Sequence, residues 1–285
     1  MIIRRTLALF FLGAALLAQT PQRIVSTAPS ITELLYALGV GDRIVGVDRF
    51  SRYPADALKK PLIGDYAAPN LEVIASLRPD LVMIPTNPVQ LRQRLEALKL
   101  RVLELNQEGI AALYESIRVV GQATGTTAQA TRLTDQIRVD LEAIRGRASK
   151  LPKTRLLFVA GRTPRRLEGL IVAGRASYLN EIIEIAGGEN IFRDAQAAYP
   201  MVSLEEILAR NPDVIVDMGE MADTVGVTEA QKQAVQGLWT RLSSVGAVRN
   251  RRVHAVASDI FVVPGPRVVA AAAEFFALLH PEAAG

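Results

Sequence analysis

The sequence predicts an α/β protein of two lobes, each with a central, mostly parallel sheet flanked by helices, joined by a single long backbone helix. Three observations lead to this prediction. Apolar runs typical of strands alternate with stretches of helical period, the alternation restarts after residue 150, and an uninterrupted amphipathic segment separates the two halves. Alternation of strands and helices is typical of parallel sheets. At 285 residues, the chain is long enough for two modest domains.

The elements of each lobe follow from apolar runs bounded by polar or turn-forming residues. In the first half we expect strands at residues 23–26, 43–47, 81–84 and 101–105, and helices at 31–38, 72–77 and 91–98. In the second half we expect strands at 156–160, 213–216 and 252–256, and a helix at 178–185. The predicted organisation is a signal peptide over 1–19, an N-terminal lobe over 20–125, a linking helix over 126–149 and a C-terminal lobe over 150–285.

Two segments match each other without gaps, residues 71–82 and residues 204–215. Both have a leucine, a glutamate, an isoleucine and a Pro-Asp pair in the same places, so that Glu72 corresponds to Glu205. Proline disfavours a helical conformation in the residue before it, so each segment predicts a short helix, a Pro-Asp turn and a strand. We therefore expect two homologous lobes; a chance match at a common α/β turn is the alternative.

The segment between the halves predicts one continuous helix. Charged residues occupy the other sides of the helical wheel, while apolar residues recur at helical spacing at Leu133, Ile137, Leu141 and Ile144. No glycine or proline occurs from Thr126 until Gly146. A helix of about 20 residues spans roughly 30 Å. Such a connector is a stiff strut, so we expect only small movements between the lobes.

The N-terminal residues predict export from the cytoplasm. Arg4 and Arg5 precede an apolar run at residues 7–18, which is shorter than the roughly 20 residues needed to span a bilayer. This pattern is typical of a cleaved signal peptide, and a retained, weakly tethering segment is the alternative. Cysteine is absent, so we expect no lipoprotein anchor, disulfide, Cys-ligated zinc or thiol nucleophile.

The charge balance does not indicate a nucleic-acid partner. The formal net charge is +4, and removing Arg4 and Arg5 with the signal peptide reduces the excess to +2. Acidic and basic residues are interleaved along the rest of the chain, which is typical of a solvated surface of mixed charge. We therefore expect no binding to nucleic acid.

Several short motifs follow the order found in one protein family. They are Arg-Ile-Val-Ser and Pro-Ser-Ile-Thr-Glu within residues 23–33, then residues 45–47, 53–54, 70–72 and 79–82, and in the second half residues 187–192, 202–205, 211–213, 258–259 and 266–267. With these motifs, nearly the whole mature chain resembles the solute-binding proteins of ABC importers that carry vitamin B12, haem and ferric siderophores. The family is known as the helical-backbone metal receptors, and the likeness is closest to its cobalamin-binding members.

The resemblance implies a periplasmic, monomeric receptor that encloses a metal chelate between its lobes. It implies cobalamin or another corrinoid as the first choice of cargo, with haem or a ferric siderophore as alternatives. The partners would be the permease and ATPase complex of an ABC importer in the inner membrane. No intrinsic cofactor, resident metal site or catalytic residue is implied.

Glu72 and Glu205 are the candidate permease-docking residues. In the family that the chain resembles, one glutamate on each lobe docks into arginine pockets of the permease, and these two positions match its motifs. A structural interpretation is compatible with docking. Asn70 and Ser203 are candidate N-caps, so each glutamate falls in a first helical turn, where the helix dipole stabilises a negative charge.

The candidate ligand-binding residues follow predicted strands, because ligands of such folds bind beyond the carboxyl ends of strands. They are Ser30, Phe50, Tyr66 and Asn87 in the first lobe, and Arg162, Arg165, Asp259 and Phe261 in the second. Tyr66 shortly precedes Glu72, at a place where cobalamin-binding relatives have a tryptophan. Arg162, Arg165 and Arg166 cluster in one loop and would suit carboxylates. Core packing for the aromatic residues and a solvated surface for the arginines are the alternatives.

Other functional classes have weaker support. The sequence has two histidines, His254 and His280, so it cannot form a three-histidine metal site, and His254 is expected to be a packed strand residue. Ser30 and Glu33 have the spacing of a capping box, which predicts a structural role. The motifs GxSxG and HExxH and a Walker loop are absent, so we expect no enzyme. A carboxylate-pair hydrolase and a non-transport, ligand-sensing receptor remain as alternatives.

Overall fold

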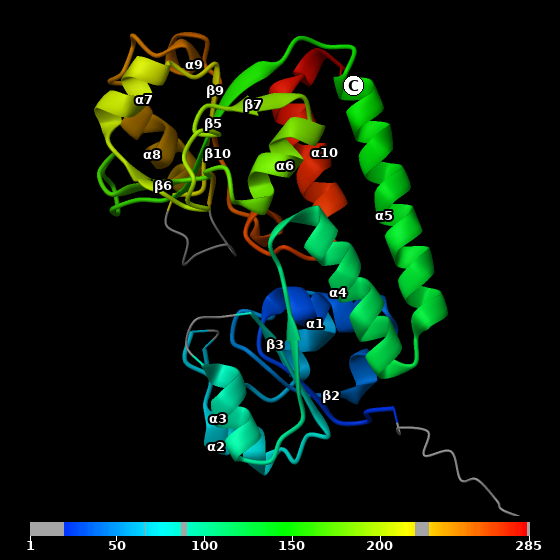
Figure 1. Ribbon diagram of the computed structural model, residues 1–285. Coiled ribbons are helices and arrows are strands. Elements are labelled where there is room, and N and C mark those ends of the chain that lie inside the picture. The colour runs from blue at the N-terminus through cyan, green and yellow to red at the C-terminus, as the bar shows by residue number, and fades with distance from the viewer. Residues whose placement is uncertain (1–19, 66, 87–89, 220–227, 284–285) are drawn as a thin grey trace, which may run out of the picture.

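The computed structural model describes residues 20–65, 67–86, 90–219 and 228–283. It contains two sheets in two lobes, with helix α5 (Thr127–Ala148) running along one side of the molecule between them (Figure 1). The predicted α/β class and two-lobe architecture are confirmed. None of the helices within the described residues is both long and apolar enough to cross a membrane.

The N-terminal lobe has a four-stranded, entirely parallel sheet in the order β2-β1-β3-β4. Its elements are β1 (Ile24–Ser26), β2 (Ile44–Val47), β3 (Leu81–Pro85), β4 (Val102–Leu105), α1 (Pro29–Ala37), α2 (Leu71–Ser76), α3 (Leu91–Ala97) and the 3-10 turns η1 (Gly41–Arg43) and η2 (Ala55–Lys59). Side chains of a strand alternate between its faces, so Ile24 joins the core on the side of α1 and Val25 joins the core beneath α2 and α3. Coverage of both faces explains why these strands are apolar throughout.

The C-terminal lobe has a mixed sheet in the order β10-β9-β5-β6-β8, with β7 also paired to β5. Strands β10, β9, β5 and β7 are parallel, whereas β6 and β8 run antiparallel to their neighbours. Its elements are β5 (Thr154–Gly161), β6 (Leu170–Val172), β7 (Gly188–Asn190), β8 (Met201–Val202), β9 (Val214–Asp217), β10 (Val253–Ala255), α6 (Tyr178–Ile185), α7 (Leu204–Arg210), α8 (Glu229–Trp239), α9 (Gly246–Arg249), α10 (Val268–Leu279), η3 (Asp259–Phe261) and η4 (Pro281–Ala283).

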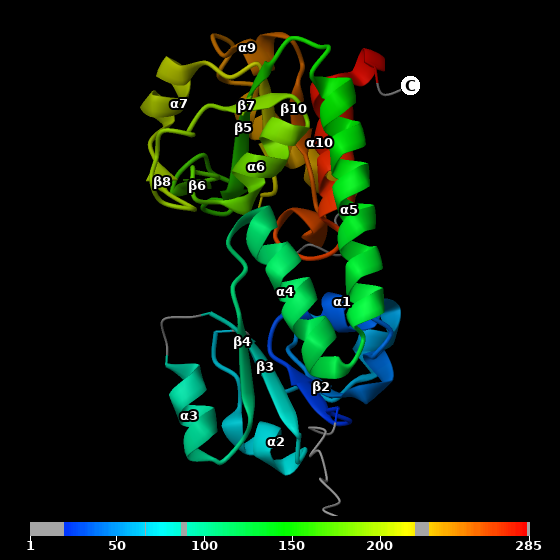
Figure 2. The same cartoon turned by 45° about the vertical axis from the view of Figure 1, so that its right-hand side comes forward.

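A second helix that the sequence analysis did not predict accompanies α5. Helix α4 (Gly109–Thr124) ends at Gly125, whose φ of 73° permits the tight turn into α5, and the two helices pack side by side (Figures 1 and 2). The N-terminus of α4 reaches the C-terminal lobe, where the Ile110 amide donates to Glu181 Oε2 at 2.9 Å. The lobes are therefore joined by a pair of packed helices rather than by an isolated rod.

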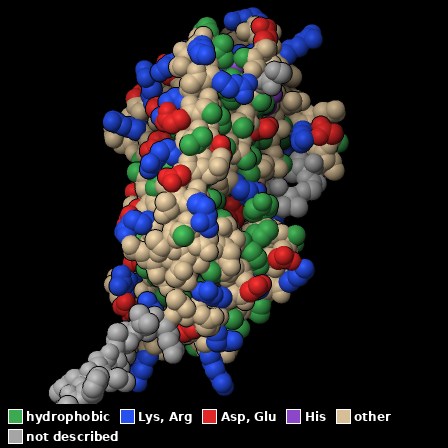
Figure 3. Space-filling model, turned by 90° about the vertical axis from the view of Figure 1, so that its right-hand side faces the viewer, with side chains coloured by type: hydrophobic (Ala, Val, Ile, Leu, Met, Phe, Trp, Pro, Cys, Tyr) green, Lys and Arg blue, Asp and Glu red, His purple; other side chains and the backbone are tan. Residues whose placement is uncertain are grey.

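One apolar core runs through both lobes. It includes Ile24 of the first sheet, Ile117 of α4, Ile137 of α5 and Phe158 of the second sheet, each buried. On the outer face beside α5, Lys and Arg side chains are interspersed with Asp and Glu side chains (Figure 3). The shared core supports the expectation of small movements between the lobes.

The matching sequence segments fold in the same way. Strand β3 starts at Leu81 and β9 at Val214, and these two positions correspond in the gap-free match of the segments. The residues before the two Pro-Asp turns, Arg78 and Asn211, both adopt left-handed backbone conformations, with φ of 46° and 44°. This agreement of backbone geometry favours a duplicated unit over a chance match.

Candidate ligand-binding cleft

A cavity of about 970 Å³ lies between the two lobes. The N-terminal lobe contributes residues at or just beyond the carboxyl ends of strands β1 to β4, which are residues 28–30, 49–50, 52, 85–86 and 106–108. The C-terminal lobe contributes residues 176–178, 198–199, 259 and 262–264. The four parallel strands all end at the same edge of their sheet, which brings these loops together. The volume is at the upper end of the usual range for ligand pockets, so the cleft suits a bulky small molecule.

Three of the sequence-predicted ligand residues line this cleft. The Ser30 hydroxyl accepts a hydrogen bond from Gln107 Nε2. The Phe50 ring is partly exposed, and the Arg49 guanidinium lies 4.6 Å from its centroid. Asp259 accepts from Arg267 Nη1 at 2.9 Å. Tyr66 and Asn87 lie outside the described residues, so their roles stay predictions.

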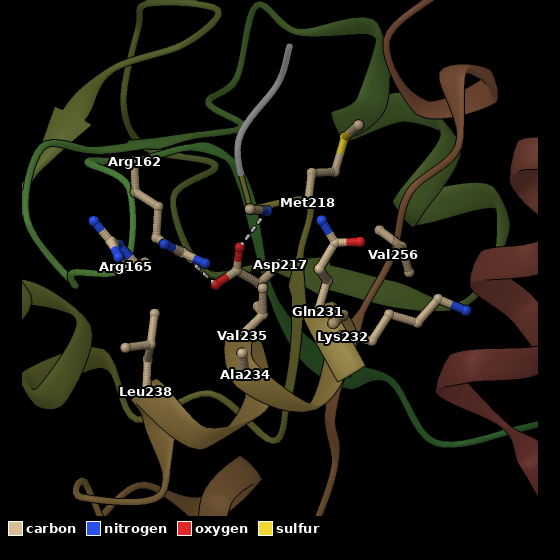
Figure 4. Close-up of a pocket in the computed structure, with 12 residues that line it drawn as sticks. Arg162, Arg165, Asp217, Met218, Gln231, Lys232, Ala234, Val235, Leu238 and Val256 are labelled. Carbon is tan, nitrogen blue, oxygen red and sulfur yellow. Dashed lines mark hydrogen bonds and ion pairs between the residues drawn. The ribbon is translucent and has the colours of Figure 1, made fainter. Parts of the chain in front are cut away.

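The structure places Arg162 and Arg165 in a different cavity from the one between the lobes. This second cavity, of about 510 Å³, lies at the carboxyl ends of β5, β9 and β10 within the C-terminal lobe (Figure 4). Arg162 points toward Asp217, and its Nε donates to Asp217 Oδ2 at 3.0 Å (Figure 4). Asp217 also accepts from Trp239 Nε1 at 2.7 Å.

This network corrects the expectation that Arg162 contacts ligand in the inter-lobe cleft. Both partners of the ion pair are buried, and a buried charge is tolerated only when it is paired and hydrogen-bonded. Arg162 therefore neutralises the buried Asp217 inside the C-terminal lobe. Arg165 and Arg166 are exposed, and Arg166 lies 3.6 Å from Glu168 on the surface.

Phe261 is a second correction. Its side chain is buried in the core, with its ring centroid 5.7 Å from that of Phe158 and 5.0 Å from that of Phe275. The turn η3 explains the difference, because it directs Asp259 toward the cleft and Phe261 into the core. The ring therefore packs the C-terminal lobe instead of facing a ligand.

The sequence analysis missed several cleft residues. They are Arg49, Arg52, Thr86, Asn106, Gln107, Tyr178 and Tyr199. Asn106 and Gln107 directly follow β4, so the rule of carboxyl ends of strands could have identified them. Tyr199 precedes β8, a strand of two residues, which is too short to leave a periodic pattern in the sequence.

An ion-pair network connects the lobes at the cleft. Arg267, at the start of α10, donates from Nε to Glu33 Oε2 of α1 at 3.0 Å and from Nη1 to Asp259. The guanidinium also lies 4.2 Å from the centroid of the Tyr53 ring. Burial raises the pKa of Glu33, and the hydrogen bonds from Arg267 oppose that rise. The predicted capping box of Ser30 and Glu33 is wrong, because α1 starts after Ala28 and the Glu33 carboxylate binds Arg267.

A second network fixes the loop that carries Arg49 and Phe50. Asp48, fully buried at the end of β2, accepts from the Ser51 hydroxyl and from the Phe50 amide at 3.0 Å. Ser51 Oγ lies 2.8 Å from Thr32 Oγ1, which donates to Ser26 Oγ at 2.8 Å. Hydroxyl groups therefore connect this cleft loop to α1 and β1. Burial raises the pKa of Asp48 to about 6.

The raised pKa of Asp48 predicts a specific dependence of stability on pH. Because the folded-state pKa of about 6 exceeds the ordinary value of 3.8, the folded protein binds this proton more tightly than the unfolded chain. The resulting stabilisation is present in full below about pH 4 and is lost as the pH rises through 6. Two pKa units correspond to about 3 kcal/mol of unfolding free energy.

We expect Asp48→Asn to remove this component of the pH dependence, because asparagine does not titrate; it keeps one of the two oxygens that accept from Ser51 and Phe50, so the variant is also less stable at every pH. Urea unfolding of wild type and variant at pH 4 to 7.5 measures the difference. Asp135→Asn, at an exposed carboxylate of α5, is the matched control. Equal pH slopes for the wild type and Asp48→Asn would contradict the prediction.

The two histidines lie apart from the cleft lining. His254 is in β10, and burial lowers its pKa; the His280 ring lies 5.4 Å from that of Phe276. Within the described residues, no cluster of three or more histidine and carboxylate side chains could hold a metal ion.

Glu72 and Glu205 are exposed near the starts of α2 and α7, which lie in different lobes on the side of the molecule away from α5 (Figure 1). Asn70 Oδ1 caps α2 by accepting from the amides of Glu72 and Val73 at 3.0 and 3.1 Å. Ser203 and Glu206 form a reciprocal capping box on α7. Because other side chains cap both helices, the carboxylates of Glu72 and Glu205 are free of that structural task.

A large cavity between two lobes that share one apolar core, lined by aromatic rings and hydrogen-bonding groups, defines the protein as a receptor for a small molecule. The chain belongs to the periplasmic binding protein family, whose model matches residues 24–259. Members of this family are binding proteins, the substrate-binding components of ABC importers, and the family places this protein in the periplasm.

Individual relatives are named for binding one of two cargoes, vitamin B12 or haem. The chain is 28% identical to a vitamin B12-binding protein of Vibrio vulnificus over 268 residues, 92% of each chain. The crystal structure of the periplasmic vitamin B12 binding protein BtuF of Vibrio cholerae matches with a TM-score of 0.77 at 25% identity, covering 92% of this chain and 98% of that one. The periplasmic heme-binding protein RhuT of Roseiflexus sp. RS-1 matches with a TM-score of 0.77 at 28% identity, covering 93% and 99%.

Proposed function

We propose that this protein captures a corrinoid, such as cobalamin, in the inter-lobe cleft and delivers it to the permease of an ABC importer. The observation that carries the choice of cargo is the chemistry of the cleft lining. Besides aromatic rings, the 970 Å³ cavity presents five uncharged side chains that donate or accept hydrogen bonds, beside four charged ones; the uncharged side chains are Ser30, Thr86, Asn106, Gln107 and Ser177.

This lining matches the periphery of a corrinoid, which carries amide side chains that both donate and accept hydrogen bonds. A site that offers hydrogen bonds to such groups rejects ligands that leave its polar atoms unpaired. The two arginines that the sequence predicts as carboxylate ligands, Arg162 and Arg165, line the other cavity. Phe50, Tyr178 and Tyr199 supply the rings against which a flat macrocycle packs.

Haem is the second candidate. Arg49 and Arg52 line the cleft and could bind propionates, and the likeness to the heme-binding RhuT is as close in sequence as that to the vitamin B12-binding relative. Arg49, however, already pairs with Asp65 at 2.8 Å. Asp259 and Glu108, also in the cleft, would repel a carboxylate.

The test of the cargo is direct titration of the purified mature protein. Cyanocobalamin, hemin and a ferric hydroxamate siderophore are added in separate experiments, and binding is followed by calorimetry and visible absorbance. We expect a saturable 1:1 complex with cyanocobalamin. Tighter binding of hemin would make the protein a haem receptor. Binding of none of the three, together with tight binding of a bare metal ion or a sugar, would overturn the cargo proposal.

The aromatic residues of the cleft give a prediction of their own. Burying an aromatic side chain contributes about 1.5–3 kcal/mol, so Phe50→Ala and Tyr199→Ala are each expected to weaken cyanocobalamin binding about tenfold to a hundredfold. Calorimetric titration of each variant provides the affinity. Leu62→Ala is the control, because Leu62 is an exposed apolar residue outside the cleft. Unchanged affinity in both aromatic variants would place the ligand elsewhere.

We further propose that Glu72 and Glu205 dock the loaded receptor onto the permease, one from each lobe. Their exposure, their matching positions in duplicated segments and the independent capping of both helices support this role. The protein would act as an exported monomer, released from the membrane by cleavage of the N-terminal segment.

A further inference from the structure

The helix that carries Glu72 is held at its C-terminal end by an arginine that precedes strand β1. Arg23, directly before β1, donates from Nη2 to the Leu77 carbonyl at 2.6 Å and from Nε to the Arg78 carbonyl at 3.1 Å. Its backbone amide donates to Asp80 Oδ1 at 3.0 Å, and the Asp80 amide donates to the Arg23 carbonyl at 2.9 Å. Arg23 thus connects the end of α2 to the sheet.

The same arrangement occurs in the other lobe. Arg155 of β5 donates from Nη2 to the Arg210 carbonyl at 2.5 Å and from Nη1 to the Asn211 carbonyl at 3.1 Å. Its backbone amide donates to Asp213 Oδ2 at 3.1 Å, and the Asp213 amide donates to the Arg155 carbonyl at 2.9 Å. The accepting carbonyls of the two lobes are separated by the same sequence offset that relates Glu72 to Glu205. We call these two sets of contacts the arginine clamps.

Both helices need such anchors. Helix α2 has six residues and α7 has seven, and helices this short are unstable by themselves in water. Each buries a single side chain, Ile74 in α2 and Ile207 in α7. The further apolar contacts, from Leu71 and Val73 of α2 and from Leu204 of α7, are only partly buried, so apolar packing holds each helix weakly. The caps Asn70 and Ser203 hold one end, and the arginine clamps hold the other.

We propose that Arg23 and Arg155 are positioning residues for permease docking, which fix the direction in which α2 and α7 present Glu72 and Glu205. This inference rests on the proposed docking function. A guanidinium suits the role because its planar fork reaches two successive carbonyls, and its charge complements the negative end of the helix dipole. The duplication supplies one clamp for each docking carboxylate.

The test uses Arg23→Gln, Arg155→Gln and the double variant in the full-length protein. Each is expressed in a strain of the source bacterium that lacks its own copy of the receptor, and the initial uptake of radiolabelled cyanocobalamin is measured. Purified variants are titrated with cyanocobalamin, and hydrogen exchange of the α2 and α7 amides is followed. Arg101→Gln and Arg241→Gln, at exposed arginines of the two lobes, are the controls.

The double variant is expected to lose about tenfold in uptake rate, each single variant less, with cyanocobalamin affinity within about twofold of wild type. Exchange is expected to accelerate in α2 only for Arg23→Gln and in α7 only for Arg155→Gln. Lysine at either position keeps the charge but reaches one carbonyl, so Arg23→Lys and Arg155→Lys are expected to restore part of the uptake. A purely structural role would lower cyanocobalamin affinity or receptor abundance together with uptake.

The experiments distinguish a failure of the clamp inference from a failure of the docking proposal. If charge reversal at Glu72 and Glu205 abolishes uptake while the clamp variants transport like wild type, the clamp inference alone is overturned. If that charge reversal leaves uptake unchanged, the docking proposal fails, and the positioning role fails with it. Faster exchange in α2 and α7 without loss of uptake also overturns the positioning role.

Discussion

Arg267→Met is expected to lower the free energy of unfolding by about 3–5 kcal/mol, the usual cost of removing one partner from a buried ion pair. The Glu33 side chain is only 3% exposed, so without the guanidinium its carboxylate has neither water nor a countercharge. The loss also releases Asp259, whose carboxylate faces the cleft. Urea unfolding at pH 7 measures the stability, and calorimetry measures the accompanying loss of cyanocobalamin affinity.

The matched control is the double variant Glu33→Gln/Arg267→Met. Because glutamine removes the unpaired charge, the double variant is expected to be more stable than Arg267→Met alone. Equal stability of the single and double variants would show that the ion pair does not determine the loss. If Arg267→Met lowers the free energy of unfolding by less than about 1 kcal/mol, the ion pair contributes no more than an exposed pair does, which would contradict the prediction from the burial of Glu33.

Reversal of both docking charges, Glu72→Arg with Glu205→Arg, is expected to reduce cyanocobalamin uptake by about a hundredfold or more. Like charges facing each other across an interface cost several kcal/mol, which corresponds to a loss of two or more powers of ten in binding. Affinity for cyanocobalamin is expected to be unchanged, because both residues lie outside the cleft lining. Uptake in the receptor-deficient strain and calorimetry on purified protein separate the two effects.

The control changes the net charge by the same amount at other sites. Asp135→Arg with Glu274→Arg places the reversal on α5 and α10, at two exposed carboxylates. Normal uptake with this variant and lost uptake with the docking variant would establish a local effect. Similar losses in both would indicate that overall charge governs the encounter with the permease. Uptake by the docking variant at the wild-type rate would overturn the docking role of Glu72 and Glu205.

Much of the fold follows from local patterns in the sequence. Strands β1 and β3 are short apolar runs because both their faces are covered, and the Pro-Asp turns mark where β3 and β9 begin. Helix α4 lies outside the predicted elements although Ile110, Leu113, Ile117 and Val120 recur at helical spacing, because the strand–helix alternation predicted for the first lobe ends with the strand at residues 101–105. Strands β6, β7 and β8 have two or three residues each, and their pairing partners rather than their composition define them.

The sequence predicts where the candidate site lies, but not the directions in which its side chains point. The rule that ligands bind beyond the carboxyl ends of strands located Ser30, Phe50 and Asp259 at the cleft. The same rule failed for Arg162 and Phe261, because it identifies an edge of a sheet and not which side chains turn inward. The partners of Arg162, which are Asp217 and through it Trp239, lie far along the chain, so only folding brings them together.

The shared interior has a consequence for how this receptor can evolve. Since Leu113 and Ile117 of α4 pack into the same apolar cluster as Phe158 and Leu179 of the second lobe, neither half has a complete core by itself. Each half depends on the other to complete this core, so exchanging one of them between related receptors would expose apolar surface to water. The loops that line the cleft can therefore change freely in evolution, whereas the two lobes that share the core must be kept together.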